Sequence, residues 1–155
     1  RFHMVAGNHS ELRMFNQPRG TFKDENMSKI VIAYIKARMK YNPNFELIEN
    51  PSGNIFDSIA GYNILGVHGE MKDMEKAIKD LSNMYGVTVD GVVAAHLHHH
   101  YSEDVGVKKF VSRCPSIIGI DDFAMSLSKG SNPGAMIIEL TPGHGKTAEY
   151  FIDLT

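Results

Sequence analysis

Apolar and polar positions follow two different periods along this chain, and each period predicts its own kind of element. Between residues 24 and 41, and again over 71–85, apolar side chains recur every three or four positions, which predicts two amphipathic helices. Gly86 stands directly after the second stripe, where a left-handed helix cap is expected. Short apolar runs bounded by turn residues predict strands at 2–6, 45–49, 54–59, 62–67, 89–95, 105–112, 116–120, 135–140 and 147–153. Because strands and helices alternate over the first two-thirds of the chain, we expect an α/β fold in which sheets and helices form layers.

The composition is that of a globular protein and argues against several classes of partner. A chain of 155 residues, 43% hydrophobic and 22% charged, predicts a single domain that spans residues 1–155. The net charge of −2 provides no basic field for nucleic acid or for an anionic membrane. No apolar stretch approaches the roughly 18 residues of a membrane span, so we expect no membrane partner. The single cysteine, Cys114, excludes an internal disulfide and fits a reducing compartment, most simply the cytoplasm.

Three of the predicted strands end in side chains that could bind a metal ion or a phosphate. Strand 2–6 is followed by Gly7-Asn8-His9, strand 62–67 by His68-Gly69-Glu70, and strand 89–95 by His96-Leu97-His98. In open α/β sheets, sites form where loops leave the carboxyl ends of the strands. We therefore expect these side chains to converge if the three strands are parallel neighbours. The alternative is that each histidine is an ordinary core or surface residue.

The three strand ends also carry a family resemblance. The segments GNHSE (7–11), GVHGE (66–70) and AHLH (95–98) resemble, in this order, the third, fourth and fifth motifs of the calcineurin-like metallophosphoesterases, which read GNH(D/E), GH and GHxH. The resemblance implies a layered β-sandwich flanked by helices and incomplete at its N-terminus, of which this chain is the C-terminal part. It also implies two divalent metal ions and the hydrolysis of phosphate esters.

The resemblance assigns a role to each matching residue. Asn8, His68 and His96 would bind the second metal ion, through the amide oxygen and the imidazole nitrogens. His98 would bind the first ion, whereas His9 would face the scissile phosphate, stabilise it and protonate the leaving oxygen. Mixed nitrogen and oxygen ligands suit Mn, Fe, Zn or Ni rather than Ca. Two such cations neutralise the phosphate oxygens and lower the pKa of a water between them.

The chain departs from the family pattern in three ways. The family's first two motifs, DxH and GDxxD, would lie before residue 1, and the chain opens with RFHMVA (1–6), inside a predicted strand and without an initiator methionine. We interpret it as the C-terminal part of a longer protein, and expect the N-terminal half of the domain or a partner chain to complete the site. Ser10 occupies the position of the acidic residue that usually follows GNH, and Glu11 stands one place later. Ala95 replaces the glycine before the last motif.

Several neighbouring residues leave alternatives open. Arg13 could bind the substrate phosphate through its planar guanidinium, although a surface ion pair is the commoner role. His99 and His100 are interpreted as loop residues or as supports of the ligands, but a shift by one step would make His98 and His100 the metal-binding pair.

The sequence thus predicts a metal-dependent phosphoesterase, with this chain alone expected to turn over little substrate. One alternative is a phosphodiesterase or nuclease of the same superfamily acting on DNA, which the lack of a basic surface disfavours. The other is a non-catalytic metal-binding or interaction module that has kept only one half of the site.

Overall fold

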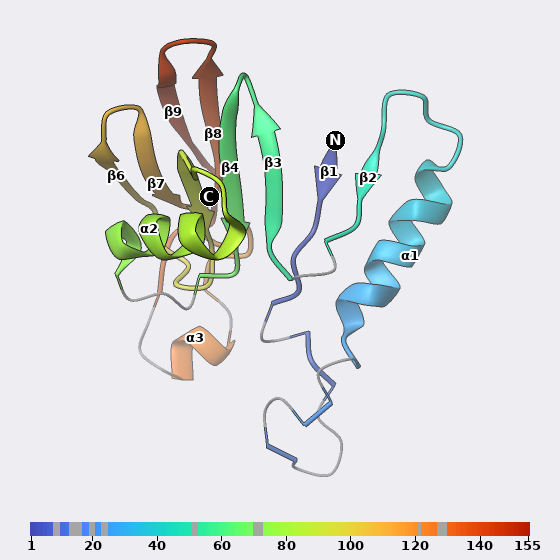
Figure 1. Cartoon of the computed structure of the whole chain (residues 1–155). Coiled ribbons are helices and arrows are strands. Elements are labelled where there is room, and N and C mark those ends of the chain that lie inside the picture. The colour runs from blue at the N-terminus through green and yellow to red at the C-terminus, as the bar shows by residue number, and fades with distance from the viewer. Residues whose placement is uncertain are drawn as a thin grey trace. The chain divides into compact units, whose positions relative to one another are not determined.

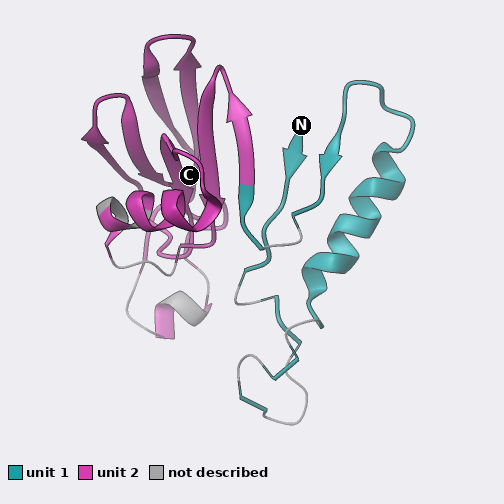
Figure 2. Ribbon diagram, in the orientation of Figure 1, with its two compact units in different colours: residues 1–55 teal, residues 56–155 magenta. Residues whose placement is uncertain are grey.

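The computed structural model describes residues 1–7, 10–12, 17–18, 21–22, 25–50, 53–69, 73–120, 122–126 and 130–155, and within the helices the side chains of residues 74, 75, 77, 123 and 124 are excepted. The chain forms two compact units, Arg1–Ile55 and Phe56–Thr155, which Figure 2 shows in different colours. Each unit is described by itself below. The single domain over residues 1–155 stays a prediction.

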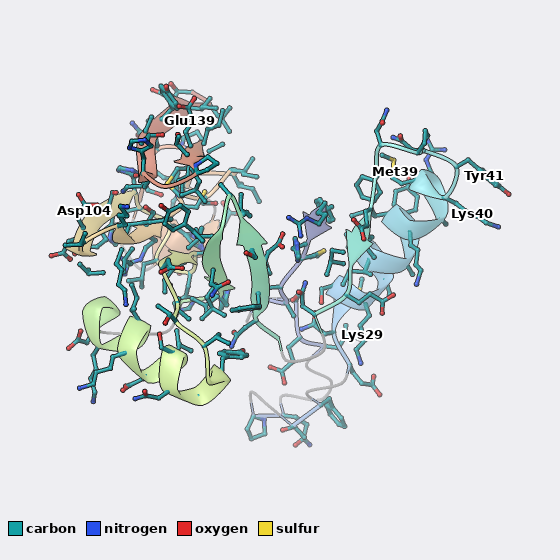
Figure 3. All side chains as sticks on the ribbon, turned by 45° about the horizontal axis from the view of Figure 1, so that its top comes forward. Lys29, Met39, Lys40, Tyr41, Asp104 and Glu139 are labelled. Atoms are coloured by element: carbon teal, nitrogen blue, oxygen red, sulfur yellow. The ribbon has the colours of Figure 1, made fainter. Side chains whose placement is uncertain are left out.

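The unit Arg1–Ile55 contains one helix and a small parallel sheet. Strand β1 (Phe2–His3) pairs in parallel with β2 (Leu47–Ile48), and α1 spans Met27–Met39 (Figure 1). The helix begins at Met27 rather than at residue 24 because the Asn26 side chain caps it, accepting a hydrogen bond of 2.9 Å from the Ser28 N–H. Figure 3 shows Lys40 and Tyr41 extending from the carboxyl end of this helix.

The unit Phe56–Thr155 is built around a five-stranded sheet, whose first strand starts at the preceding residue. Its strand order is β3-β4-β5-β7-β6. The bounds are β3 Ile55–Ile59, β4 Tyr62–Val67, β5 Gly91–Ala94, β6 Tyr101–Gly106 and β7 Lys109–Arg113. Strands β4, β5 and β7 run parallel, whereas β6 runs antiparallel to β7. The carboxyl ends of β4, β5 and β7 therefore lie at the same edge of the sheet.

One face of this sheet packs against α2 (Met74–Tyr85). Leu65 of β4, Val92 of β5 and Val111 of β7 are fully buried and share a core with Ile78 and Leu81 of the helix. A fully buried aliphatic side chain of this size contributes about 1.5–3 kcal/mol to folding. These side chains therefore fix the helix on the sheet.

Both ends of α2 are capped by side-chain or backbone groups. Asp73 accepts a hydrogen bond of 2.9 Å from the Lys76 N–H at the amino end. Gly86 has a φ of 66° and its N–H donates to the Ser82 carbonyl, as the sequence predicts for a left-handed cap.

The other face of the sheet packs against the hairpin of β8 (Gly134–Thr141) and β9 (Gly145–Asp153). Successive residues of a strand point to opposite faces, so Phe110 and Ser112 of β7 face away from α2. Lys146 of β9 lies 5.1 Å from the centre of the Phe110 ring, and Ser112 donates a hydrogen bond to Glu149 of the same strand. Helix, sheet and hairpin form three layers, and the predicted α/β class is confirmed.

Two predicted strands differ from the structure. The run 105–112 is divided by a turn at Val107 and Lys108, where Lys108 takes a φ of 58°, so it belongs to two antiparallel strands. The run 116–120 forms no strand, because Gly119 turns the chain with a φ of 74° and leaves Ile117 and Ile118 exposed. Over the described residues, no helix combines the length and the apolar character that crossing a membrane requires.

Candidate metal site

The ends of β4 and β5 bring two of the predicted ligands to one place. The two strands are parallel neighbours, and their register sets Val67 opposite Ala94. His68 follows β4 directly and His96 comes two residues after β5, so both leave the same edge of the sheet. The sequence predicts that the side chains after these strands converge if the strands are parallel neighbours, and β4 and β5 are parallel neighbours.

The two imidazoles are in direct contact. His96 Nδ1 lies 3.0 Å from His68 Nε2, and the ring centres are 4.7 Å apart at an interplanar angle of 64°. Without a metal ion, one nitrogen donates its proton to the other. Two nitrogens each about 2.1 Å from one ion stand about 3.4 Å apart at the tetrahedral angle of zinc and about 3.0 Å apart at the 90° angle of octahedral coordination. The observed separation is that of a hydrogen bond, and it is also compatible with two neighbouring ligands of one octahedral divalent ion.

Glycine is required where these two strand ends approach each other. Gly69 has a φ of 98°, and a Cβ at this position would lie 2.9 Å from the Ala95 carbonyl oxygen. That distance is too short for any other residue unless the backbone moves. The small residue after His68 therefore sets how closely the two histidine-bearing loops can approach.

The loop that carries His96 is strained. The Leu97 N–H donates to the Ala95 carbonyl at 2.8 Å, which closes a three-residue turn about His96 with a φ of 68°. This φ belongs to the rare form of the γ-turn. His98 also has a positive φ, 59°, and such a conformation costs roughly 1–2 kcal/mol at a residue other than glycine. Strain of this kind clusters at functional sites.

Of the remaining predicted site residues, only His98 lies within the described part of the chain, and it is not gathered with this pair. His98 does not join His68 and His96, since the described part of the chain holds no group of three or more metal-binding side chains. Asn8, His9 and Arg13 lie outside the described residues. Strand β1, which precedes Asn8, pairs with β2 within the unit Arg1–Ile55.

His99 links the loop that carries His96 to strand β7. Its Nε2 lies 3.1 Å from Arg113 Nη1, and its Nδ1 lies 2.9 Å from the Leu97 carbonyl oxygen. A guanidinium only donates hydrogen bonds, so Nε2 must accept and Nδ1 must carry the proton that it donates to Leu97. This tautomer ties the loop to Arg113 at the end of β7.

Arg113 is a residue that the sequence analysis did not single out. It is 7% exposed, and its guanidinium carbon lies 5.4 Å from the centre of the Tyr101 ring. Tyr101 is the residue opposite Arg113 in the β6–β7 register. Its Nε has no hydrogen-bond partner among the described residues. The only signal in the sequence is a cation within the otherwise uncharged run FVSRC (110–114).

His100 belongs to a second polar cluster, on the hairpin side of the sheet. Its Nε2 lies 2.8 Å from Glu149 Oε1, and the other carboxylate oxygen accepts hydrogen bonds from Ser112 and, at 3.3 Å, from Lys146 Nζ. Burial raises the pKa of Glu149, but the hydrogen bonds from Ser112 and His100 and the charge of Lys146 outweigh it and hold that pKa below its usual value. The alternative pairing of His98 with His100 gains no support, because His100 faces Glu149.

A curated protein is similar in sequence to most of this chain. No protein-family model matches the sequence. The SPbeta prophage-derived uncharacterized protein YonJ of Bacillus subtilis (strain 168) is 29% identical over 153 residues, which cover 96% of this chain and 38% of YonJ. The chain thus spans well under half the length of this curated relative.

Two solved structures align with this chain. Wild-type Vps29 of Entamoeba histolytica, in a crystal structure complexed with Zn²⁺, has a TM-score of 0.47 and 16% identity, over 71% of this chain and 69% of that chain. The solution structure of Thermotoga maritima protein TM1076 has a TM-score of 0.53 and 12% identity, over 97% of this chain and 96% of that chain. At this identity the similarity to TM1076 extends to the fold alone: the chain adopts a mixed α/β architecture that is also found in that protein.

Proposed function

We propose that this chain carries part of a dinuclear metal centre that hydrolyses phosphate esters, with His68 and His96 as two ligands of one divalent ion. The observation that carries the proposal is the 3.0 Å separation of His96 Nδ1 and His68 Nε2 at the ends of neighbouring parallel strands. The order of the three motifs in the sequence, GNH, GVH and AHLH, supports it.

The chemistry follows from neutral ligands. A divalent ion at this position would act as a Lewis acid on a phosphoryl oxygen and lower the pKa of water. Because His68 and His96 bring no negative charge, they would leave the charge of the ion available for that purpose. In this proposal Asn8 is a further ligand, His98 a ligand of the other ion, and His9 the proton donor to the leaving oxygen; these roles rest on the sequence alone.

The proposal requires further ligands from outside this chain. Two imidazoles leave a divalent ion short of the four or more ligands that it takes in proteins. The N-terminal half of the domain, or a partner chain, would supply them. The activity and the substrate of the whole protein are therefore part of the proposal.

Metal binding tests the site directly. We expect Co²⁺ added to the full-length protein to give a visible absorption spectrum, and His68→Ala and His96→Ala each to weaken the affinity about tenfold or more, since even residues that only support a ligand cost about 10–100-fold. His144→Ala, an exposed histidine in the β8–β9 turn, is the matched control. Equal affinity in all four proteins would contradict the proposal.

Turnover tests the reaction and its two rivals. The full-length protein with Mn²⁺ is assayed on p-nitrophenyl phosphate and on bis-p-nitrophenyl phosphate; preference for the diester favours a phosphodiesterase, of which a nuclease acting on DNA is one form. Metal binding without hydrolysis of either favours a non-catalytic module.

A further inference from the structure

Arg113 lies at the carboxyl end of β7, beneath the loop that carries the candidate metal ligands. Strand β7 stands between β5 and β6, so residues 95–100 must pass over its end to connect those two strands. Ala94 is opposite Arg113 in the β5–β7 register, and the Cys114 N–H donates to the Ala94 carbonyl at 2.8 Å. Arg113 Nη1 lies 3.1 Å from His99 Nε2, so the guanidinium contacts the same short loop that carries His96 and His98.

Among the described residues no carboxylate is paired directly with Arg113, and the Glu103 carboxylate nearby accepts a hydrogen bond from the Tyr101 hydroxyl instead. A buried guanidinium is normally paired, because removing a charge from water is costly. Here its partners are the Nε2 lone pair of His99 and the face of the Tyr101 ring. Its buried Nε has no hydrogen-bond partner among the described residues.

We propose that Arg113 binds a phosphoryl oxygen pair of the phosphoester substrate. The N–H groups of Nε and of one terminal nitrogen form a fork that matches two phosphate oxygens, and His99 takes only Nη1. The ring of Tyr101, which is 36% exposed, lies over the guanidinium, so removing this ring should ease the access of a ligand. The inference rests on the proposed function for the nature of the ligand. It concerns a residue outside the predicted metal ligands and distinct from Arg13.

The test follows the Arg113 Nε–H resonance of the ¹⁵N-labelled full-length protein in EDTA. Methyl phosphate and dimethyl phosphate are added in turn, with chloride at equal ionic strength as the control. We expect a saturable shift of this resonance, with the preferred ester class identifying a monoester or a diester ligand. Arg113→Lys should weaken the affinity by about tenfold or more, because lysine is a point charge without the fork. Arg38→Lys, an exposed arginine of α1, should leave it unchanged.

A second variant, Tyr101→Ala, tests the inference if circular dichroism shows that Arg113→Lys does not fold. Tyr101→Ala retains the guanidinium and removes its cover, so phosphate affinity should rise severalfold. If neither the wild-type chain nor Tyr101→Ala shows a saturable Nε–H shift with either ester, the inference is overturned.

The outcome is separable from that of the proposed function, because phosphate binding is measured without metal and metal binding without phosphate. Loss of Co²⁺ binding with phosphate binding intact contradicts the metal centre alone. The reverse result contradicts the anion site alone.

Discussion

Replacing Gly69 by alanine gives a quantitative test of how closely the ends of β4 and β5 approach. Gly61 and Gly69 flank β4, and both have positive φ angles, 84° and 98°. An added Cβ meets nothing within 4 Å at Gly61, but at Gly69 it lies 2.9 Å from the Ala95 carbonyl oxygen and 3.2 Å from the Ala94 Cβ. Both substitutions therefore place a residue with a Cβ at a positive φ, but only Gly69→Ala also brings that Cβ into a steric clash.

The expected magnitudes follow from these two terms. A positive φ costs a residue with a Cβ about 1–2 kcal/mol, so Gly61→Ala should lower the free energy of unfolding by that amount. Forcing a methyl group against packed backbone adds about 1–3 kcal/mol, so Gly69→Ala should lower it by about 2–5 kcal/mol. The extra loss reflects movement of the β4 end away from β5, which should also separate His68 from His96.

Urea unfolding of both variants, analysed by linear extrapolation, measures the difference. Co²⁺ titration of the folded variants measures the second effect, with weaker binding expected in Gly69→Ala only. If the two variants lose the same free energy and bind Co²⁺ equally, Gly69 does not set the spacing of the histidines.

Further predictions concern stability. Glu149→Gln should lower the free energy of unfolding by about 1–3 kcal/mol at pH 7, because the buried Ser112 and its neighbours lose a charged acceptor. Since the pKa of Glu149 is lowered in the folded chain, its stabilising contribution is present above the usual glutamate pKa and is lost as the pH falls through the lowered value. The urea midpoints of the wild-type protein and of Glu149→Gln should therefore converge on acidification. A constant difference between the two midpoints down to pH 2 would refute this. Asp73→Ala should cost about 0.5–2 kcal/mol through loss of the α2 cap to Lys76, seen as a lower urea midpoint, and an unchanged midpoint would show that the cap is dispensable. Leu65→Ala should cost about 2–5 kcal/mol in the same assay, with less than 1 kcal/mol contradicting its central place in the core.

Elements defined by local signals could be predicted from the sequence. The run 62–67 coincides with β4 because glycines stand close to both of its ends, at Gly61 and Gly69. The end of α2 and its Gly86 cap follow from the apolar stripe and the glycine after it. The β6–β7 hairpin was missed because its turn residues, Val107 and Lys108, are not residues that usually mark a turn.

Properties that depend on distant partners could not be predicted in the same way. The apolar stripe of α1 is typical of core packing, yet Ile30 and Tyr34 are 60% and 64% exposed. The contact between His68 and His96 depends on the β4–β5 register, which joins residues far apart in sequence. The burial of Arg113 depends on a strand order in which β5 and β6, although consecutive, are not adjacent.

That strand order limits how the histidine loop can vary in length. Residues 95–100 have to span the width of one intervening strand between two fixed attachment points, at Ala94 and Tyr101. An extra residue there would have to bulge outward and carry the imidazoles with it, whereas the exposed tip at Val107, 90% accessible, can accept an insertion without disturbing them. Chain length in this segment is consequently as strict a requirement as the identity of its histidines.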